Sequence, residues 1–255
     1  MDFDWRIWGY TFLTKDVPAA FPGGASHKAG EPIFYASLTR NADGGLIGFT
    51  QPRPAAMAID IAINTALRAN ALKQTLELMP TITPHGKGLQ VNNSSHLFDY
   101  FECCMVSVTF CVQSLDTFCN EIIEAYVKGT IPIRVDKKMK NLNKIQLQEN
   151  FSLKMKIGTI LPKIFSINSP ENLADPTIWN KYIELERVRN TTVHLKTSDE
   201  NSGVYIDRDS LFSEFFKTNT KDYPSSALDI MEYFKPNIKN NEWITKAREK
   251  ITSNQ

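Results

Sequence analysis

The longest uninterrupted segment of the chain is SSHLFDYFECCMVSVTFCVQSLDTFCNEIIEAYV, which runs from Ser94 to Val127. Its apolar residues recur at the three- and four-residue spacing of an amphipathic helix, and no glycine or proline interrupts it. Gly129 and Pro132 then supply residue types that end a helix. The segment predicts one helix of about nine turns, with Ser94 or Ser95 as its N-cap.

A second helical pattern precedes this segment and several follow it. Pro54 suits a first helical turn, and apolar residues continue at roughly helical spacing from there to Met79. Downstream, we expect helices over residues 144–165, with a stop near Pro162, and over residues 177–196. Shorter helices are expected at residues 211–216, 227–233 and 242–251.

The first 50 residues have a different character. Residues 6–13, 33–38 and 46–49 are short runs rich in strand-forming side chains. The Asp-Gly and Gly-Gly pairs between the last two runs favour a hairpin turn. We therefore expect a small antiparallel meander, and we expect a loop over residues 80–93.

These patterns predict a mainly α protein that is α+β overall. Residues 1–90 are expected to hold a small β-rich region followed by a helix, and residues 91–255 a helical bundle. Hydrophobic residues make up 42% and charged residues 22% of the 255, as in globular proteins. The formal net charge is only +1, so the chain as a whole does not attract nucleic acid or membranes.

The amino-terminal residues bear on where in the cell the protein is located, and the histidines and cysteines bear on whether it binds a metal. Asp2 and Asp4 stand where a secretory leader has basic residues, and Asp60 and Arg68 interrupt the most membrane-like stretch. We therefore expect a cytoplasmic protein that does not bind a membrane. The four histidines are scattered, and the cysteines form no C-x-x-C pair, so we expect neither a metal nor another cofactor. Buried, reduced thiols are expected at Cys103, Cys104, Cys111 and Cys119.

One segment departs from the even charge balance. Residues 128–163 hold nine lysines and arginines against two acidic residues, a local charge of +7. A solvated surface and a track for a polyanion both explain such a cluster. In the second interpretation, Lys137, Lys138 and Lys140 contact the phosphates of RNA.

The segment from Trp179 to His194, WNKYIELERVRNTTVH, is the most informative about function. On a helix, one mainly apolar stripe is expected to pack into the core: Ile178, Tyr182, Leu185, Val188, Thr192 and Leu195. A second stripe consists of Trp179, Ile183, Glu186, Asn190 and His194. Because a solvated face rarely carries Trp and Ile, we expect the second stripe to form an interface or the wall of a cleft. As a dimer interface, it would include Trp179, Ile183 and Glu186.

The six residues from Arg189 to His194 have the form R-N-x-x-x-H. With the preceding W-x-x-Y-x-E-L pattern, they resemble the R-x(4–6)-H motif of HEPN domains, which are helical bundles that include many ribonucleases. Residues 113–121 are similar to the early helix of that family and residues 154–162 to its middle helix, so the resemblance spans about residues 94–251. Lys196 stands where HEPN toxins that are neutralised by a nucleotidyltransferase have a tyrosine, so that mode of neutralisation is not implied.

The resemblance implies a HEPN-like helical bundle that forms a homodimer with a composite site. His194 would transfer protons, Arg189 would bind and stabilise the phosphorane, and Asn190 would orient the histidine or the substrate. Lys196 would add to the RNA-binding lysines. The implied activity is that of a metal-independent endoribonuclease leaving 2′,3′-cyclic phosphate and 5′-hydroxyl ends. Such a protein acts as a toxin or antiviral effector, with an antitoxin or another regulatory partner.

Three alternatives remain open. A catalytically silent HEPN module would dimerise, bind RNA or dock a partner. The residues alone also allow an ion pair between Arg189 and Glu186 and a structural role for His194. The third alternative concerns four aromatic residues of the N-terminal region: Trp5, Trp8, Tyr10 and Tyr35. They would either stack on RNA bases or contact a partner, or they would pack against the bundle.

Overall fold

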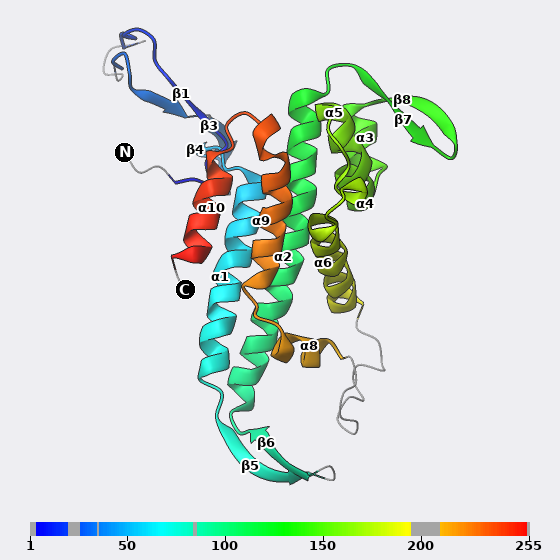
Figure 1. Cartoon of the computed structure of the whole chain (residues 1–255). Coiled ribbons are helices and arrows are strands. Elements are labelled where there is room, and N and C mark those ends of the chain that lie inside the picture. Colours follow the sequence, from blue (N-terminus) through cyan, green and yellow to red (C-terminus); the bar gives the residue numbers. More distant parts are fainter. Residues whose placement is uncertain (1–3, 20–25, 35, 84–85, 195–209, 254–255) are drawn as a thin grey trace.

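Helices form the body of the molecule, and two-stranded sheets project from it (Figure 1). This computed structural model describes residues 4–19, 26–34, 36–83, 86–194 and 210–253. The arrangement confirms the prediction of a mainly α chain with small antiparallel sheets.

Two long antiparallel helices, α1 (Pro54–Gln74) and α2 (Ser94–Tyr126), organise the body. They lie side by side along most of their length (Figure 1). The face of α1 that packs into the core is rich in alanine, so the two backbones approach closely, and Ser107 Oγ on α2 donates a hydrogen bond to the Ala62 carbonyl at 2.9 Å. The predicted helix at residues 94–127 is thus confirmed, although its N-cap is Asn93 rather than a serine.

Four further helices pack on this pair: α6 (Thr177–Val193), α8 (Leu211–Lys217), α9 (Asp222–Phe234) and α10 (Glu242–Thr252). Helix α9 contacts α2, α6 and α10, and buries Leu228, Met231 and Phe234 at the centre of the core. It begins at Asp222, five residues earlier than expected, because Pro224 falls in its first turn, where proline is tolerated. A short 3₁₀ turn, η4 (Lys235–Asn237), leads into α10.

Residues 144–165 form a broken series of helices rather than one helix. The series consists of α3 (Lys144–Glu149), α4 (Leu153–Met155), the π-helical turn η1 (Lys156–Ile160) and α5 (Leu161–Phe165), and the 3₁₀ turn η2 (Pro170–Asn172) follows it. The expected stop at Pro162 is wrong. Just before it, the Leu161 N–H bonds to the Lys156 carbonyl, five residues back. This wider register accommodates a ring that would clash with a carbonyl in a regular α-helix.

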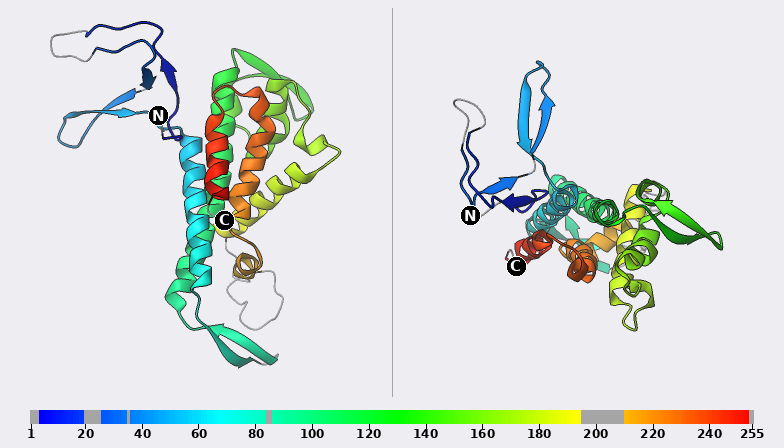
Figure 2. Two further views of the ribbon diagram at one scale, coloured as in Figure 1. Left: turned by 60° about the vertical axis from the view of Figure 1, so that its left-hand side comes forward. Right: turned by 90° about the horizontal axis from the view of Figure 1, so that it is seen from above.

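The described residues contain four separate two-stranded antiparallel sheets (Figures 1 and 2). They pair β1 (Tyr10–Phe12) with β2 (Pro32–Phe34), β3 (Ala36–Arg40) with β4 (Leu46–Thr50), β5 (Leu78–Thr83) with β6 (Gly86–Val91), and β7 (Thr130–Val135) with β8 (Lys138–Asn143). The expected meander is therefore wrong, because β2 and β3 belong to different sheets. Both strands of a two-stranded sheet are edge strands, and short strands can form such a sheet.

The expected loop at residues 80–93 is also wrong, because most of it belongs to the β5–β6 hairpin. Helix α1 correspondingly ends at Gln74, before Met79. Pro80 does not prevent strand pairing here, because both strands of a two-stranded sheet are edge strands. Gly86 has a φ of 118° and starts β6 in a conformation that glycine adopts without strain.

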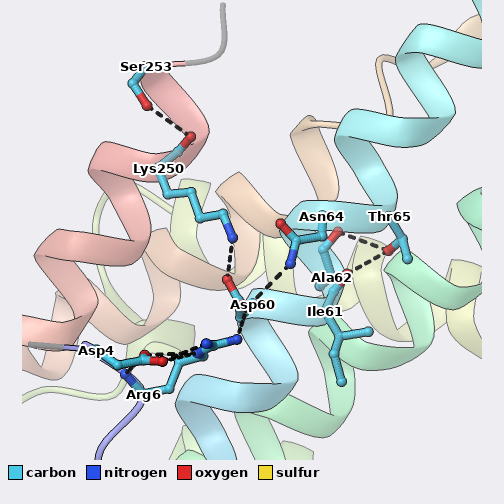
Figure 3. Close-up of polar contacts among 9 residues, drawn as sticks. All are labelled: Asp4, Arg6, Asp60, Ile61, Ala62, Asn64, Thr65, Lys250 and Ser253. Carbon is cyan, nitrogen blue, oxygen red and sulfur yellow. Dashed lines mark hydrogen bonds and ion pairs between the residues drawn. The ribbon is translucent and has the colours of Figure 1, made fainter.

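The N-terminal segment is tied to the bundle by the buried carboxylate of Asp60 on α1 (Figure 3). Asp60 accepts hydrogen bonds from Arg6 Nη1 at 2.9 Å and from Lys250 Nζ on α10 at 2.6 Å. Trp5 packs against the core, which supports the packing interpretation for this residue. Helices α1 and α2, which lie on either side of the expected boundary at residue 90, contribute to one core.

Candidate functional site

Helix α6 positions the residues of the R-N-x-x-x-H motif. Asp175 Oδ1 accepts a hydrogen bond from the Thr177 N–H at 2.9 Å, which satisfies one of the free donors at the start of the helix. The expected core stripe is confirmed, with Ile178 half-buried and the following side chains buried: Tyr182, Leu185, Val188 and Thr192. Leu195 lies outside the described residues. Core packing therefore sets the rotation of α6 and, with it, the direction of the motif.

Arg189, Asn190 and His194 lie together at the C-terminal end of α6. Arg189 Nη1 donates to Asn190 Oδ1 at 3.0 Å, and the main-chain N–H of His194 donates to the Asn190 carbonyl at 2.9 Å. Arg189 is half-buried, whereas Asn190 and His194 are exposed. Asn190 is thus hydrogen-bonded to Arg189 through its side chain and to His194 through an ordinary main-chain bond of the helix, and the group is open to a ligand from solvent.

The alternative ion pair between Arg189 and Glu186 does not form among the described residues. Glu186 Oε1 instead accepts a hydrogen bond from the Tyr182 hydroxyl at 2.6 Å. Burial, with this hydrogen bond, raises the pKa of Tyr182, so its hydroxyl keeps its proton. The helical ion pair on this segment belongs to Arg187, which contacts Glu184 at 2.7 Å. Arg189 is therefore not neutralised by the acidic residue that the sequence places nearest to it.

The predicted dimer stripe is only partly on the surface. Trp179 is 9% exposed, and its ring packs against Tyr182 with 5.2 Å between ring centroids. A Cβ added at Gly158 in the π-helical turn would lie 3.1 Å from the Trp179 ring, so the chain itself covers this side chain. Trp179 is therefore a core residue, and its predicted contact with a partner does not hold. Ile183 is 36% exposed, and Glu186 is half-buried.

The three predicted RNA-binding lysines lie on the exposed β7–β8 hairpin. Lys137 and Asp136 form its turn with φ of 64° and 51°, while Lys138 and Lys140 project from one face of β8 because side chains alternate along a strand. Figure 1 shows this hairpin beyond the C-terminal end of α2, whereas α6 ends toward α8 at the other end of the body. Within one chain, these lysines are not brought to the α6 motif. Lys196 lies outside the described residues.

The basic segment is also not a uniform surface. Lys156 is 3% exposed, and its Nζ lies 2.8 Å from Asp116 Oδ1 on α2. Lys144 is paired with Glu124. Of the exposed basic residues in this segment, four lie on the hairpin (Arg134, Lys137, Lys138 and Lys140) and three lie outside it (Lys128, Lys154 and Lys163).

The four cysteines are buried and reduced, as predicted. Burial raises the pKa of Cys104 to about 11 and also raises that of Cys103, so these thiols stay protonated and are poor nucleophiles. Within the residues that the structure describes, no group of three or more histidine, cysteine, aspartate or glutamate side chains is arranged to hold a metal ion. In the same part of the chain, no helix is both long and apolar enough to cross a membrane.

A second feature was not anticipated from the sequence. Arg53 and Glu121 line a cavity of about 430 Å³ near the C-terminal end of α2. The available signal was Glu121 itself, a carboxylate next to the apolar Ile122 and Ile123 on a helix that is buried along most of its length. Its partner is 68 residues away in the sequence, so the pair could not be recognised before the fold was known.

Compared with protein-family models, curated proteins and solved structures, the chain has no match.

Proposed function

We propose that this protein is a metal-independent endoribonuclease of the HEPN type. The observation that carries the proposal is the position of Arg189, Asn190 and His194 at one helix end, where the Asn190 side chain accepts a hydrogen bond from Arg189. RNA cleavage needs a positively charged side chain and a side chain that transfers protons, and Arg189 and His194 are of these two kinds. Both are held by a helix whose opposite face is anchored in the core.

The chemistry proceeds through attack of a ribose 2′-oxygen on the adjacent phosphorus. Histidine, with an ordinary pKa of about 6.5, can take the 2′-hydroxyl proton or return a proton to the leaving 5′-oxygen. The planar guanidinium of Arg189 presents paired donors to the phosphate oxygens and stays charged throughout. The bond from phosphorus to the 5′-oxygen then breaks, which leaves a 2′,3′-cyclic phosphate and a 5′-hydroxyl.

A second copy of the chain would complete the site. One imidazole cannot be deprotonated to accept a proton and protonated to donate another at the same moment, so two copies of His194 would divide the roles. Ile183 and Val193 are 36% and 54% exposed, and they share a face of α6 with Glu186 and Asn190. This exposed apolar surface beside the motif supports a homodimer through α6.

The biological role that fits this activity is that of a cytoplasmic toxin or antiviral effector. Cleavage of host or invader RNA would arrest growth, and an antitoxin or another regulatory partner would hold the activity in check. A catalytically silent module that dimerises and binds RNA is the second candidate, because the exposed apolar face of α6 would serve assembly equally well.

Purified protein incubated with single-stranded RNA in excess EDTA tests the proposal. We expect fragments with 2′,3′-cyclic phosphate ends, and we expect His194→Ala to lower the rate at least 100-fold, within the usual contribution of an acid–base group. Arg189→Lys should be similarly impaired, because an ammonium lacks the fork of donors. His96→Ala, which removes an exposed histidine from α2, is the matched control. RNA binding without cleavage would favour the silent module.

A further inference from the structure

The cavity near the C-terminal end of α2 has the size and lining of a small-molecule site. Its volume of about 430 Å³ falls within the common range for ligand pockets. The wall combines three parts of the chain that are distant in sequence: Trp8 from the N-terminal segment, Glu121 and Tyr126 from α2, and Lys239 and Trp243 from the start of α10 and the loop before it. Aromatic rings, one carboxylate and lysine side chains therefore meet around a single space.

Arg53 holds these walls in place. Its guanidinium carbon lies 5.5 Å from the ring centroids of both Trp8 and Trp243. Its two terminal nitrogens donate to the carbonyls of Trp8 at 2.8 Å and of Asn240 at 2.9 Å. Because these bonds join the N-terminal segment to the loop before α10, the cavity is defined before any ligand enters.

The carboxylate of Glu121 is held in the cavity wall, and one of its two oxygens accepts no hydrogen bond from the described residues. Oε1 accepts a hydrogen bond from the Ala55 N–H at 3.0 Å. Oε2 forms an ion pair with Arg53, 3.8 Å from Nε, which is beyond hydrogen-bond distance, and no hydrogen bond to Oε2 forms within the described part of the chain. A mostly buried acceptor of this kind favours a ligand that brings N–H donors.

We propose that this cavity binds a guanine nucleotide. The edge of guanine carries two adjacent donors, N1–H and N2–H, which a fixed carboxylate can accept together, whereas adenine presents an acceptor at N1. The half-buried rings of Trp8 and Tyr126 supply apolar surface for the planar base. Lys128 and Lys239 line the same cavity and supply positive charge for a phosphate.

The nucleotide can be free or part of an RNA strand, since both offer the same base and phosphate. Lys128 lies two residues before the β7–β8 hairpin, so the cavity and the exposed lysines of that hairpin lie at the same end of α2 (Figure 1). An RNA strand that follows the hairpin would thus pass near the cavity. The inference goes beyond the proposed cleavage site and does not depend on its activity.

Calorimetric titration at pH 8 tests the inference with guanosine monophosphate, adenosine monophosphate and guanosine as the three probes. We expect guanosine monophosphate to bind at least tenfold more tightly than adenosine monophosphate. Glu121→Gln should reduce that preference to less than twofold, because a carboxamide can accept only one of the two N–H groups without a clash. Lys239→Ala should weaken guanosine monophosphate at least threefold but leave guanosine unchanged, and Lys246→Ala on the outer face of α10 is the matched control.

Two octaribonucleotides, one with a single guanine and one without, separate the sources of the ligand. They are titrated into His194→Ala protein, so that cleavage cannot alter them. Guanine-dependent binding of the octamer alone identifies RNA as the source, and binding of the mononucleotide alone identifies a free nucleotide.

The inference is overturned if folded protein binds neither guanosine monophosphate nor the guanine octamer. It is also overturned if Glu121→Gln keeps the full preference for guanine. Should Glu121→Gln not fold, as judged by circular dichroism, Lys239→Ala and Trp8→Leu carry the test, and unchanged binding in both contradicts the inference.

Discussion

The guanidinium of Arg189 donates a hydrogen bond to the side-chain carbonyl of Asn190, the next residue in the chain, at 3.0 Å. The bond restricts a long, flexible side chain at the exposed end of a helix. It also gives Asn190 a definite role in the proposed site, that of a positioning residue which directs the phosphate-binding group.

Replacement of Asn190 tests this relationship. We expect Asn190→Ala to lower RNA cleavage about tenfold, since a hydrogen bond to a charged group contributes about 1.5 kcal/mol and each 1.4 kcal/mol is a factor of ten. The thermal midpoint should not change, because the side chain is exposed. Asn180→Ala, which alters an exposed asparagine near the other end of α6, is the control. Equal rates for both variants would remove the positioning role.

The dimer proposal is tested on the exposed face of α6. Ile183→Asp combined with Val193→Asp should convert the protein to monomers and lower cleavage at least 100-fold, because charge opposes burial of this surface and each site needs two histidines. Ile145→Asp, which changes an exposed residue of α3, should leave assembly and activity unaltered. Sedimentation velocity reports the oligomeric state. Monomers that cleave at the wild-type rate would exclude a composite site.

The hairpin lysines are tested through salt dependence. Each phosphate contact on a single strand contributes about 0.7 to the slope of log affinity against log salt. Replacement of Lys137, Lys138 and Lys140 by alanine should therefore lower the slope for RNA by about 2. Fluorescence anisotropy at several salt concentrations measures it, with Lys246→Ala as the control. An unchanged slope would leave the hairpin as a solvated surface.

The ion pair between Lys156 and Asp116 gives a prediction for stability. Asp116→Ala leaves a buried ammonium without its partner and should lower the free energy of unfolding by about 3 kcal/mol. Lys156→Met fills nearly the same volume without a charge and should change the free energy of unfolding by less than about 1.5 kcal/mol. Urea denaturation at pH 7 compares the two. A larger loss in the methionine variant would show that the pair is net stabilising.

The buried carboxyl of Glu121 predicts a pH dependence. Burial raises its pKa from 4.5 to about 7, so the folded protein binds this proton more tightly than the unfolded chain does. The resulting stabilisation is complete below pH 4.5 and is lost as the pH rises through about 7. A shift of this size corresponds to about 3 kcal/mol. Glu121→Gln cannot ionise, so its stability relative to wild type should rise by about that amount between pH 4.5 and pH 8 in urea denaturation. Parallel pH profiles would contradict the assignment.

Much of the helical framework was determined by the sequence itself. The apolar period of residues 94–127 predicted α2 almost to the residue, and the core stripe from Tyr182 to Thr192 predicted which face of α6 is buried. Such patterns can be recognised because a helix repeats every 3.6 residues. The spacing of apolar residues along a few turns therefore indicates which face of the helix is buried. The spacing of Arg189, Asn190 and His194 belongs to the same local information.

Only the tertiary structure decided what lies next to each surface. The sequence placed Trp179 on a stripe that faces away from the core, but the π-helical turn at residues 156–160 folds over it. Separation along the chain likewise hides the pairing of Arg53 with Glu121, 68 residues apart, and of Lys156 with Asp116, 40 residues apart. A side chain that points away from the main core is buried only if another part of the chain packs over it. The periodicity of the helix itself does not show whether this happens.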